Sequence, residues 1–335
     1  MKALVTGGTG LLGSHIAAAL VEQGHEVRAL ARRTSDARYL ESIGAGIVWG
    51  DVEDYETLPQ AVAGADIVFH AASRVALGWG EWEDFERTNV KGTEDLLKTS
   101  AEAGVSRFLH VSTTCVYSRL PGPATPLVET SPREASCTPD TYYHFSKLKA
   151  EEAVFGCQEQ GKLNVTIIRP ETIYGPRDRY GTDRMYSHVS KRIVLWPGKS
   201  SPLRAPVYAS DVAELAILAA TSDQAIGQAY NVAPPQPVPY REMARHMIRA
   251  QGGKRVHINL PFRLMLLAAA MMEGWARLRR SKEMPFLTPA GLRSFSEDHL
   301  IDGSKARTDL GWEQEVSLEE GTRRYVEWRL SQKKT

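Results

Sequence analysis

Short apolar runs alternate with stretches of helical periodicity along the first half of the chain. The runs are rich in β-branched and other apolar residues, and they are KALVT (2–6), EVRAL (26–30), GIVWG (46–50), DIVFH (66–70), RFLHVS (107–112) and NVTIIR (164–169). Between them, segments such as SHIAAALVEQG and NVKGTEDLLKTSAEAG repeat apolar residues every three or four positions, which is typical of a helix with one buried face. The alternation predicts an α/β fold in which helices cover both faces of a parallel sheet.

This rhythm ends near residue 176. Prolines become frequent after it, as in PPQPVP (234–239), and the apolar runs become isolated. We therefore expect a first domain over residues 1–176 and a smaller C-terminal domain, mainly for substrate binding, over 177–335. Segment 206–232 is expected to return to the sheet of the first domain, because it again combines strand-like and helical patterns.

The longest apolar run, Leu264–Met272, lies within residues 261–280. It is far shorter than the ~20 residues that a membrane-spanning helix requires, so a buried or surface-resting helix is expected. The cationic residues that follow the run are Arg277, Arg279, Arg280 and Lys282. They suit an anionic membrane surface, but they suit the C-terminal end of any solvated helix equally well. Membrane contact is therefore the less favoured alternative.

Charge and cysteine usage exclude some classes of function. Forty-one basic and forty acidic side chains among 335 residues leave a formal net charge of +1, which provides no general field for attracting nucleic acid. Cys115, Cys137 and Cys157 form no CxxC pair, and they are expected to be reduced thiols in a cytoplasmic protein. His15 and His144 have no partner at metal-ligand spacing, so no metal site is predicted.

A glycine-rich turn, TGGTGLLG (6–13), follows the first predicted strand and opens the first predicted helix. Its three spaced glycines let the backbone turn tightly and approach a pyrophosphate, whose charge then lies at the N-terminus of the helix. This context predicts a Rossmann-type, doubly wound parallel sheet that binds a dinucleotide. The residues expected to contact the cofactor here are Gly7, Thr9, Gly10, Leu11, Leu12 and Gly13.

The end of the second predicted strand bears on the choice of cofactor. An acidic residue there normally holds the ribose hydroxyls of NAD, but this chain has Ala31 followed by Arg32 and Arg33. A guanidinium at this place can neutralise a 2′-phosphate and bind it with two hydrogen bonds. NADP is therefore the expected cofactor, and NAD is the alternative if the two arginines are merely solvated.

Two adjacent tyrosines precede a lysine in TYYHFSK (141–147). Residues four apart share a helix face, so Tyr143 pairs with Lys147, whereas Tyr142 pairs with Ser146. A phenol has a pKa of about 10 and is a poor acid or base at neutral pH, but a lysine ammonium beside it stabilises the phenolate and lowers that pKa. Tyr143 and Lys147 are therefore the candidate proton-transfer pair.

The order of these motifs resembles that of the extended short-chain dehydrogenase/reductase family, and the resemblance covers nearly the full length of the chain. The motifs that carry it are TGGTGLLG, GDVED (50–54), VFHAAS (68–73), NVKGT (89–93), STTCVY (112–117), YHFSK (143–147), IIRPETIYGP (167–176), VYASDVAE (207–214) and LIDGSKARTDLGW (300–312). Each motif alone is modest, whereas several of them in this order are highly specific.

The resemblance implies roles for three residues in catalysis. Tyr143 is the expected acid/base, and Lys147 is expected to steady it while binding the nicotinamide ribose. Thr113 occupies the place of the family's Ser/Thr, whose hydroxyl holds the reacting oxygen of the substrate. Ser112 or Thr114 is the alternative for this hydroxyl.

The resemblance also implies further contacts to the cofactor. Asp51 and Val52 would border the adenine. Ala71 and Ala72 would let the cofactor lie against the fourth strand, and Pro170 would place backbone near the nicotinamide carboxamide.

The family contains reductases, hydroxysteroid-type dehydrogenases, and nucleotide-sugar epimerases and dehydratases, so the fold alone does not decide the substrate. Sugar-nucleotide members usually have asparagine where RPET places Thr172. The loop at 73–85 carries Trp79 and Trp82, and it looks like the loop of 3β-hydroxysteroid dehydrogenase-like and 2-alkyl-3-oxoalkanoate reductase-like members. Arg204 instead favours a nucleotide-sugar substrate, because an arginine at this position binds the diphosphate in the sugar-nucleotide enzymes of the family.

We therefore expect an NADP-dependent oxidoreductase that transfers hydride to or from a secondary alcohol or ketone on an apolar or amphipathic small molecule. A nucleotide-sugar epimerase or dehydratase is the alternative. A non-catalytic NADP sensor on the same fold is a third hypothesis, but such proteins typically lack the tyrosine–lysine pair. The resemblance also implies a homodimer, paired through helices at about 84–103 and 143–160.

Overall fold

The structure, a computed structural model, describes residues 1–335 except 119–124, 135, 179, 282, 295 and 333–335, so Lys282 lies outside the described residues. Within the described residues, seven parallel strands form a central sheet: β1 (Lys2–Thr6), β2 (Glu26–Ala31), β3 (Gly46–Trp49), β4 (Ile67–His70), β5 (Arg107–Val111), β6 (Asn164–Pro170) and β11 (Ala229–Val232). They lie in the order β11-β6-β5-β4-β1-β2-β3. The order reverses between β1 and β4, and ligands of such sheets bind at the carboxyl ends of the strands near that point.

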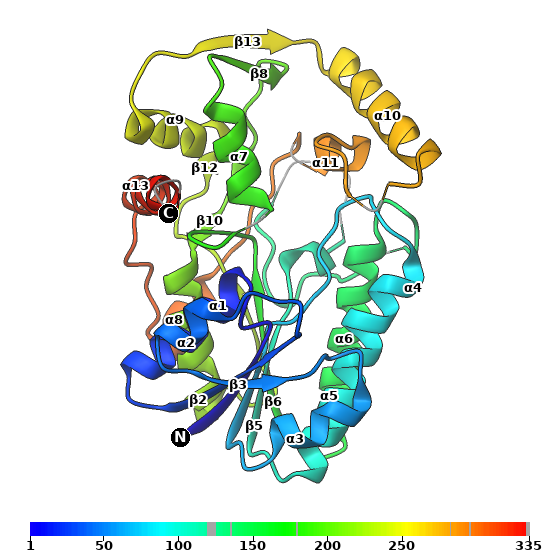
Figure 1. The fold of residues 1–335 in the computed structure, drawn as a ribbon, viewed down its shortest axis with the longest axis vertical. Coiled ribbons are helices and arrows are strands. Elements are labelled where there is room, and N and C mark those ends of the chain that lie inside the picture. Colours follow the sequence, from blue (N-terminus) through cyan, green and yellow to red (C-terminus); the bar gives the residue numbers. More distant parts are fainter. Residues whose placement is uncertain (119–124, 135, 179, 282, 295, 333–335) are drawn as a thin grey trace.

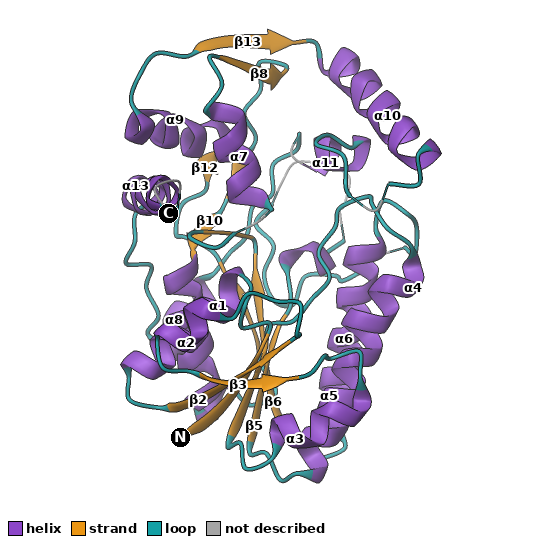
Figure 2. Ribbon diagram, in the orientation of Figure 1, coloured by secondary structure: helices purple, strands orange, loops and turns teal. Residues whose placement is uncertain are grey.

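Alternate residues of a strand pack against opposite helical layers, because successive side chains point to opposite faces of the sheet. In β1, Ala3 and Val5 belong to one apolar core and Leu4 belongs to the other. Figure 2 shows the sheet between its two layers of helices. The first layer contains α1 (Leu11–Glu22), α2 (Arg38–Ser42), α8 (Ala209–Thr221) and α12 (Ser304–Leu310), and the second contains α3 (Leu58–Val62), α4 (Trp82–Phe85), the π-helical turn η2 (Glu86–Lys91), α5 (Gly92–Glu102) and α6 (Tyr142–Glu159) (Figure 1).

The doubly wound α/β fold predicted from the sequence is confirmed, and each of the six predicted strands is a strand of the central sheet. Within segment 206–232, α8 packs on α1 and β11 forms an edge of this sheet. β10 (Pro206–Tyr208) instead pairs with β7 (Thr172–Tyr174) outside it.

The remaining elements are short strand pairs and helices, mostly beyond the carboxyl end of the sheet. They are η1 (Tyr55–Thr57), η3 (Thr114–Val116), α7 (Gly181–Val189), β8 (Ile193–Pro197), β9 (Leu203–Arg204), η4 (Asp223–Ala225), β12 (Val238–Pro239), α9 (Tyr240–Gln251), β13 (Val256–Leu260), α10 (Phe262–Leu278), α11 (Pro289–Ser294) and α13 (Leu318–Ser331). β8 pairs with β13, and β9 pairs with β12. None of the helices within the described residues is long and apolar enough to cross a membrane.

Candidate active site

Thr113, Tyr143 and Lys147 lie together beside the carboxyl end of β5. Tyr143 and Lys147 are one turn apart at the beginning of α6. Thr113 follows β5 and caps η3, where its Oγ1 accepts a hydrogen bond of 3.2 Å from the amide of Cys115. The Thr113 hydroxyl is also hydrogen-bonded to the Tyr143 phenol. Of the three adjacent hydroxyl residues in this motif, Thr113 is thus the one that reaches the phenol.

The Lys147 side chain is buried, and its ammonium is held from two sides. Its Nζ donates to the carbonyl oxygen of Val111 at 2.7 Å and to Nε2 of His110 at 3.0 Å. Burial lowers the pKa of Lys147 to about 7, although the Glu151 carboxylate acts to raise it. Burial and the Lys147 charge also hold the pKa of His110 well below its ordinary value, so the ring is neutral and can accept through Nε2. The sequence predicts His110 only as a strand residue.

The pKa of the Tyr143 phenol differs from the expectation that Lys147 lowers it. Burial and the neighbouring Cys115 raise this pKa above its ordinary value, and the hydrogen bond with Thr113 opposes the shift only in part. The Lys147 ammonium is directed at Val111 and not at the phenol. Tyr143 is therefore protonated at neutral pH in this geometry, and a protonated phenol is suited to donating its proton to a carbonyl oxygen.

Tyr142 packs against the loop that carries the two predicted substrate tryptophans. Its ring centroid lies 5.9 Å from that of Trp82 and 6.2 Å from that of Phe85. Trp79 is buried, and the guanidinium of Arg277 lies 5.3 Å from its ring centroid. The loop is thus packed against α6 through Trp82 and against the end of α10 through Trp79.

Asn89, in the π-helical turn η2, joins this loop to α6. Its Oδ1 accepts hydrogen bonds from the Arg74 amide at 2.7 Å and from the Ser73 hydroxyl at 3.1 Å. Its Nδ2 donates to the Arg74 carbonyl oxygen at 3.0 Å and to Ser146 Oγ at 2.9 Å. Ser146 in turn donates to the carbonyl oxygen of Tyr143 at 2.8 Å. The amide therefore uses all its hydrogen-bonding positions. Three of the bonds hold the loop at residues 73–74, and the fourth holds Ser146, and through it the first turn of α6 with Tyr143.

The glycine loop forms a cradle that fits a dinucleotide pyrophosphate. Gly7 has a φ of +68°, and a Cβ on it would lie 2.7 Å from the carbonyl carbon of Ala71. A Cβ on Gly13 would collide with the carbonyl oxygen of Gly7, so both positions require glycine. Gly10 begins α1 without a side-chain cap, so the first amides of this helix can bind an anion.

Arg177 is a cation beside this cradle that no sequence pattern indicates. Its Nε donates to Ser14 Oγ, in the first turn of α1, at 2.8 Å, and its guanidinium lies 3.7 Å from the centroid of the Tyr39 ring. Its φ of +70° is in the left-handed region, which is uncommon for any residue but glycine. A strained, stacked arginine at a helix N-terminus is placed to meet a bound phosphate. No motif distinguishes it, because it simply follows the proline of the YGP motif.

The other predicted cofactor residues lie at the carboxyl ends of the strands. Arg32 and Arg33 are exposed after β2, Asp51 and Val52 follow β3, Ala71 and Ala72 follow β4, and Pro170 ends β6. The Ala72 amide donates to Thr6 Oγ1 at 3.2 Å, which joins the end of β4 to the end of β1. The structure thus places these residues along the same edge of the sheet as the glycine cradle.

Arg204, the predicted diphosphate contact, is neutralised by the protein itself. One of its terminal nitrogens donates to Glu171 Oε1 at 2.9 Å, and the other donates to the carbonyl oxygen of Ser294. His299 Nδ1 lies 3.3 Å from the same Glu171 oxygen. Burial alone would raise the pKa of Glu171, but the hydrogen bond from His299 and the charge of Arg204 hold it below its ordinary value. Glu171 is therefore an anion at neutral pH, and the ion pair is buried.

Glu171 and His299 were missed from the sequence, where a buried carboxylate cannot be told from a solvated one. Thr172, beside Glu171 in RPET, hydrogen-bonds to it. The Cys115 thiol interacts electrostatically with His299 of this group and with Tyr143 of the catalytic cluster. Burial would raise the pKa of Cys115, but His144 and His299 lower it to about 6.

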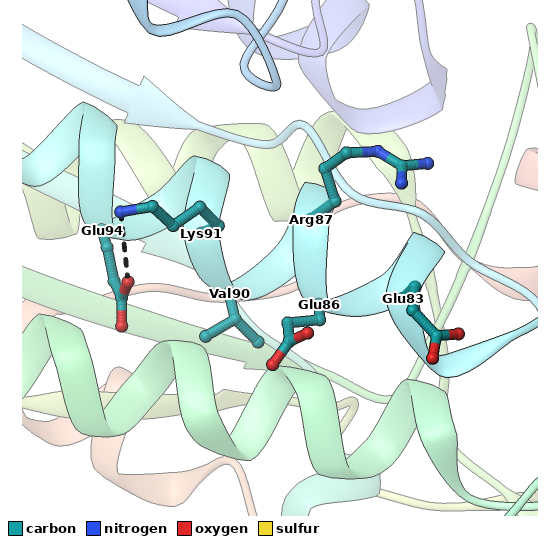
Figure 3. Close-up of a pocket in the computed structure, with 6 residues that line it drawn as sticks. All are labelled: Glu83, Glu86, Arg87, Val90, Lys91 and Glu94. Atoms are coloured by element: carbon teal, nitrogen blue, oxygen red, sulfur yellow. Dashed lines mark ion pairs between the residues drawn. The ribbon is translucent and has the colours of Figure 1, made fainter.

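A shallow groove lies along α4, η2 and α5 (Figure 3), and no residue of the catalytic cluster lines it. Its volume is about 350 Å³, and it is lined by Glu83, Glu86, Arg87, Val90, Lys91 and Glu94. Most of these side chains are charged, and Lys91 and Glu94 form an ion pair at 3.9 Å. Among the described residues, no group of histidine, cysteine, aspartate and glutamate side chains is arranged to hold a metal ion.

Known sequences resemble this chain over most or nearly all of its length. The sequence model described as the NAD dependent epimerase/dehydratase family matches residues 3–233. A 2-alkyl-3-oxoalkanoate reductase of Stenotrophomonas maltophilia (strain K279a) is 31% identical over 97% of this chain and 98% of its own length. A 4-hydroxy-2-methyl-3-oxo-4-farnesyl-3,4-dihydroquinoline-1-oxide ketoreductase of Stigmatella aurantiaca is 30% identical over 96% of this chain and 94% of its own length.

Solved structures share the fold. The crystal structure of gox2253 has a TM-score of 0.79 at 26% identity and covers 99% of this chain and 98% of its own. A UDP-glucuronic acid 4-epimerase from Bacillus cereus, in complex with UDP-glucuronic acid and NAD, has a TM-score of 0.78 at 19% identity and covers 99% of this chain and 100% of its own. At 19% identity, the likeness to this epimerase extends to the fold and not to the substrate.

Proposed function

The chain belongs to the NAD dependent epimerase/dehydratase family and is an NAD(P)-dependent oxidoreductase, and we propose that it transfers hydride between NADP(H) and a secondary alcohol or ketone on an apolar or amphipathic small molecule. The proposal adds the preferred cofactor, the substrate class and the catalytic residues to what family membership establishes. The observation that carries the substrate class is the buried ion pair between Arg204 and Glu171.

This ion pair argues against a nucleotide-sugar substrate. A nucleotide diphosphate carries two negative charges, and burying them without matching cations is costly. Arg204 has the position of a diphosphate clamp, but its charge is balanced by Glu171, and a diphosphate would meet that carboxylate as well. Trp82, which is only partly buried, offers apolar area instead, and such area stabilises an apolar ligand by roughly 25 cal/mol per Å².

The names of the relatives support the same substrate class. The Stenotrophomonas maltophilia enzyme is named for a 2-alkyl-3-oxoalkanoate, and the Stigmatella aurantiaca enzyme for a 3-oxo compound with a farnesyl group. Each name combines a keto group with an apolar chain. A substrate of that kind requires one polar anchor at its reacting oxygen and an apolar wall for the rest.

Tyr143, Thr113 and Lys147 have separate tasks in the proposed reaction. When bound, NADP(H) supplies or accepts the hydride at the carbinol carbon. In reduction, the Tyr143 phenol donates its proton to the carbonyl oxygen, and the Thr113 hydroxyl donates a hydrogen bond to the same oxygen. Lys147 would bind the nicotinamide ribose, and Asn89 holds the first turn of α6 in place through Ser146.

The proposed preference for NADP rests on Arg32 and Arg33. They are exposed where the 2′-phosphate of the adenosine ribose would lie, and Ala31 leaves that place without the usual carboxylate. The cradle at Gly7, Gly10 and Gly13 fits the pyrophosphate of either dinucleotide. The proposed preference for NADP over NAD therefore depends on the two arginines.

A substrate panel tests this function. The purified protein is incubated with NADPH and, in separate reactions, 2-alkyl-3-oxoalkanoates, 3-ketosteroids and UDP-sugars. We expect NADPH to be consumed with a ketone and the matching alcohol to form. Conversion of a UDP-sugar without net consumption of the cofactor, lost in Arg204→Ala, would instead establish an epimerase.

A further inference from the structure

The outer face of α10 carries a stripe of exposed apolar side chains. They are Leu264, Leu267, Met271, Trp275 and Leu278, which are 59%, 57%, 62%, 56% and 77% exposed, and we call these five the α10 stripe. At about 100° per residue they fall within a sector of about 80° on one side of the helix. The opposite side is packed, since Met265 and Ala269 are buried in one cluster with Leu292 of α11.

A second exposed apolar surface lies on the strand pair that precedes α10. β8 and β13 pair in parallel, with Ile193 opposite Val256 and Leu195 opposite Ile258. All four side chains are exposed, and their spacing of two residues places them on one face of the strand pair. β13 leads into α10 through Pro261, and both elements lie at the same end of the molecule, at the top of Figure 1. Apolar surface of this extent usually marks an interaction site.

The charges beside the α10 stripe are mostly positive. Residues 262–280 contain the arginines Arg263, Arg277, Arg279 and Arg280 and one acidic residue, Glu273, which is paired with Arg277 at 2.9 Å. In projection along the helix, Arg263 flanks one side of the stripe and Arg279 flanks the other, whereas Arg277 is directed at Glu273 and Trp79. Four arginines against one glutamate give residues 262–280 a net formal charge of +3. An apolar stripe between cations is typical of a helix that lies in a membrane interface.

α10 also borders the loop of the candidate active site. Arg277, in its last turn, lies 5.3 Å from the ring centroid of Trp79. The segment that follows the helix contacts the same loop, where Thr288 Oγ1 donates to the carbonyl oxygen of Leu77 at 3.3 Å. A ligand that leaves a bilayer beside α10 would therefore meet the loop that carries Trp79 and Trp82.

We propose that the α10 stripe and the outer face of β8 and β13 dock in the interface of an anionic phospholipid bilayer, from which the enzyme takes its amphipathic ketone. The inference that the ketone comes from the bilayer depends on the proposed function. The inference that the protein docks on a bilayer depends only on the exposed surface. A bilayer is favoured over a second copy of this chain because cations on both sides of the stripe complement anionic headgroups, whereas two α10 helices packed face to face would bring like charges together.

Sedimentation of the full chain with lipid vesicles tests the docking. The wild type is expected to bind vesicles of phosphatidylcholine and phosphatidylglycerol more tightly than vesicles of phosphatidylcholine alone, and to lose this preference as the salt concentration rises. Leu267→Gln with Met271→Gln should weaken binding by about a hundredfold, because burial of each of the two side chains contributes a factor of about ten. Leu330→Gln, at an exposed position on α13, is the matched control and should bind as the wild type does.

Several results would overturn the docking. One is wild-type protein that stays in solution with the anionic vesicles, and another is an equal loss in the Leu330→Gln control. A lipid-free dimer that dissociates in the Leu267→Gln, Met271→Gln variant would also overturn it, since the stripe would then bind a second copy. Turnover of a short, water-soluble ketone is measured on the same samples and should be equal in all three proteins. Vesicle binding without any ketone turnover would support the docking and refute the proposed function.

Discussion

The Lys147 ammonium donates a hydrogen bond of 3.0 Å to Nε2 of His110, a neutral ring of β5. A buried charge is normally balanced by an opposite charge at hydrogen-bond distance. The carboxylate of Glu151 is instead bound by Arg169 and Arg133, at 2.7 Å in each case. Lys147 therefore remains a buried cation with neutral acceptors, which explains why its pKa is lowered to about 7.

Lys147 should make the stability of the protein depend on pH. Its pKa is 10.5 in the unfolded chain and about 7 in the folded protein, so between these values the unfolded chain binds a proton that the folded protein does not. The free energy of unfolding therefore rises with pH across this window, and the gain is lost as the pH falls through about 7. Urea unfolding at pH of about 7 and about 9.5 should show the wild type gaining stability relative to Lys147→Met. An identical pH dependence in the two proteins would contradict the lowered pKa.

Removal of the Glu171 carboxylate should destabilise the fold strongly. Glu171→Gln leaves the buried Arg204 charge without its counterion, and loss of one partner of a buried pair costs about 3–5 kcal/mol. Glu152→Gln is the control, because Glu152 forms an exposed pair with Lys149 at 2.7 Å, and such pairs contribute about 1 kcal/mol or less. Chemical denaturation measures both variants, and similar losses in the two would show that the Glu171 pair is effectively solvated.

The sequence predicts the strands of this protein well because parallel strands are buried on both faces. Such strands appear as apolar runs, and KALVT, for example, coincides with β1 (Lys2–Thr6). The spacing of Tyr143 and Lys147 likewise identifies a helical pair, since four residues make about one turn. Both inferences depend on residues that are close together in the sequence.

The features that the sequence missed depend on contacts between distant segments. Glu171 contacts His299, which is more than a hundred residues away in the sequence. The Lys147 ammonium of α6 is hydrogen-bonded to His110 of β5. Burial then reverses the expected direction of the Tyr143 pKa, because the phenolate loses more hydration than its neighbours restore. The apolar run at 264–272 is visible in the sequence, but only the structure shows that half of its helix surface is unpacked.

Cofactor preference should depend on Arg32 and Arg33. A charged hydrogen-bonded contact to the 2′-phosphate contributes about 1.5–3 kcal/mol, so Arg32→Ala with Arg33→Ala should weaken NADP binding by roughly ten- to a hundredfold and leave NAD binding nearly unchanged. Arg38→Ala is the control, because Arg38 is exposed on α2 and paired with Asp36 at 2.6 Å. Fluorescence titration with both cofactors measures the effect, and tighter binding of NAD by the wild type would refute the preference.

The homodimer implied by the family resemblance should have an interface on the outer side of α5 and α6. Light scattering at micromolar concentration is expected to give twice the 37.1 kDa of one chain. Val90→Arg, in the groove of Figure 3, should shift the mass toward that of a single chain. Leu267→Gln should leave the dimer intact, since α10 is assigned to the bilayer. A wild-type mass of one chain would contradict this prediction.

The rate of NADPH-dependent ketone reduction in Tyr143→Phe and Tyr142→Phe tests the account most directly. Tyr143→Phe removes the proton that the reaction requires at the carbonyl oxygen, so turnover should fall by at least about a hundredfold while NADPH binding is retained. Tyr142→Phe keeps the ring that packs on Trp82, so its turnover should stay close to that of the wild type. Equal losses in the two variants, or full activity in Tyr143→Phe, would contradict the assignment of Tyr143 as the proton donor.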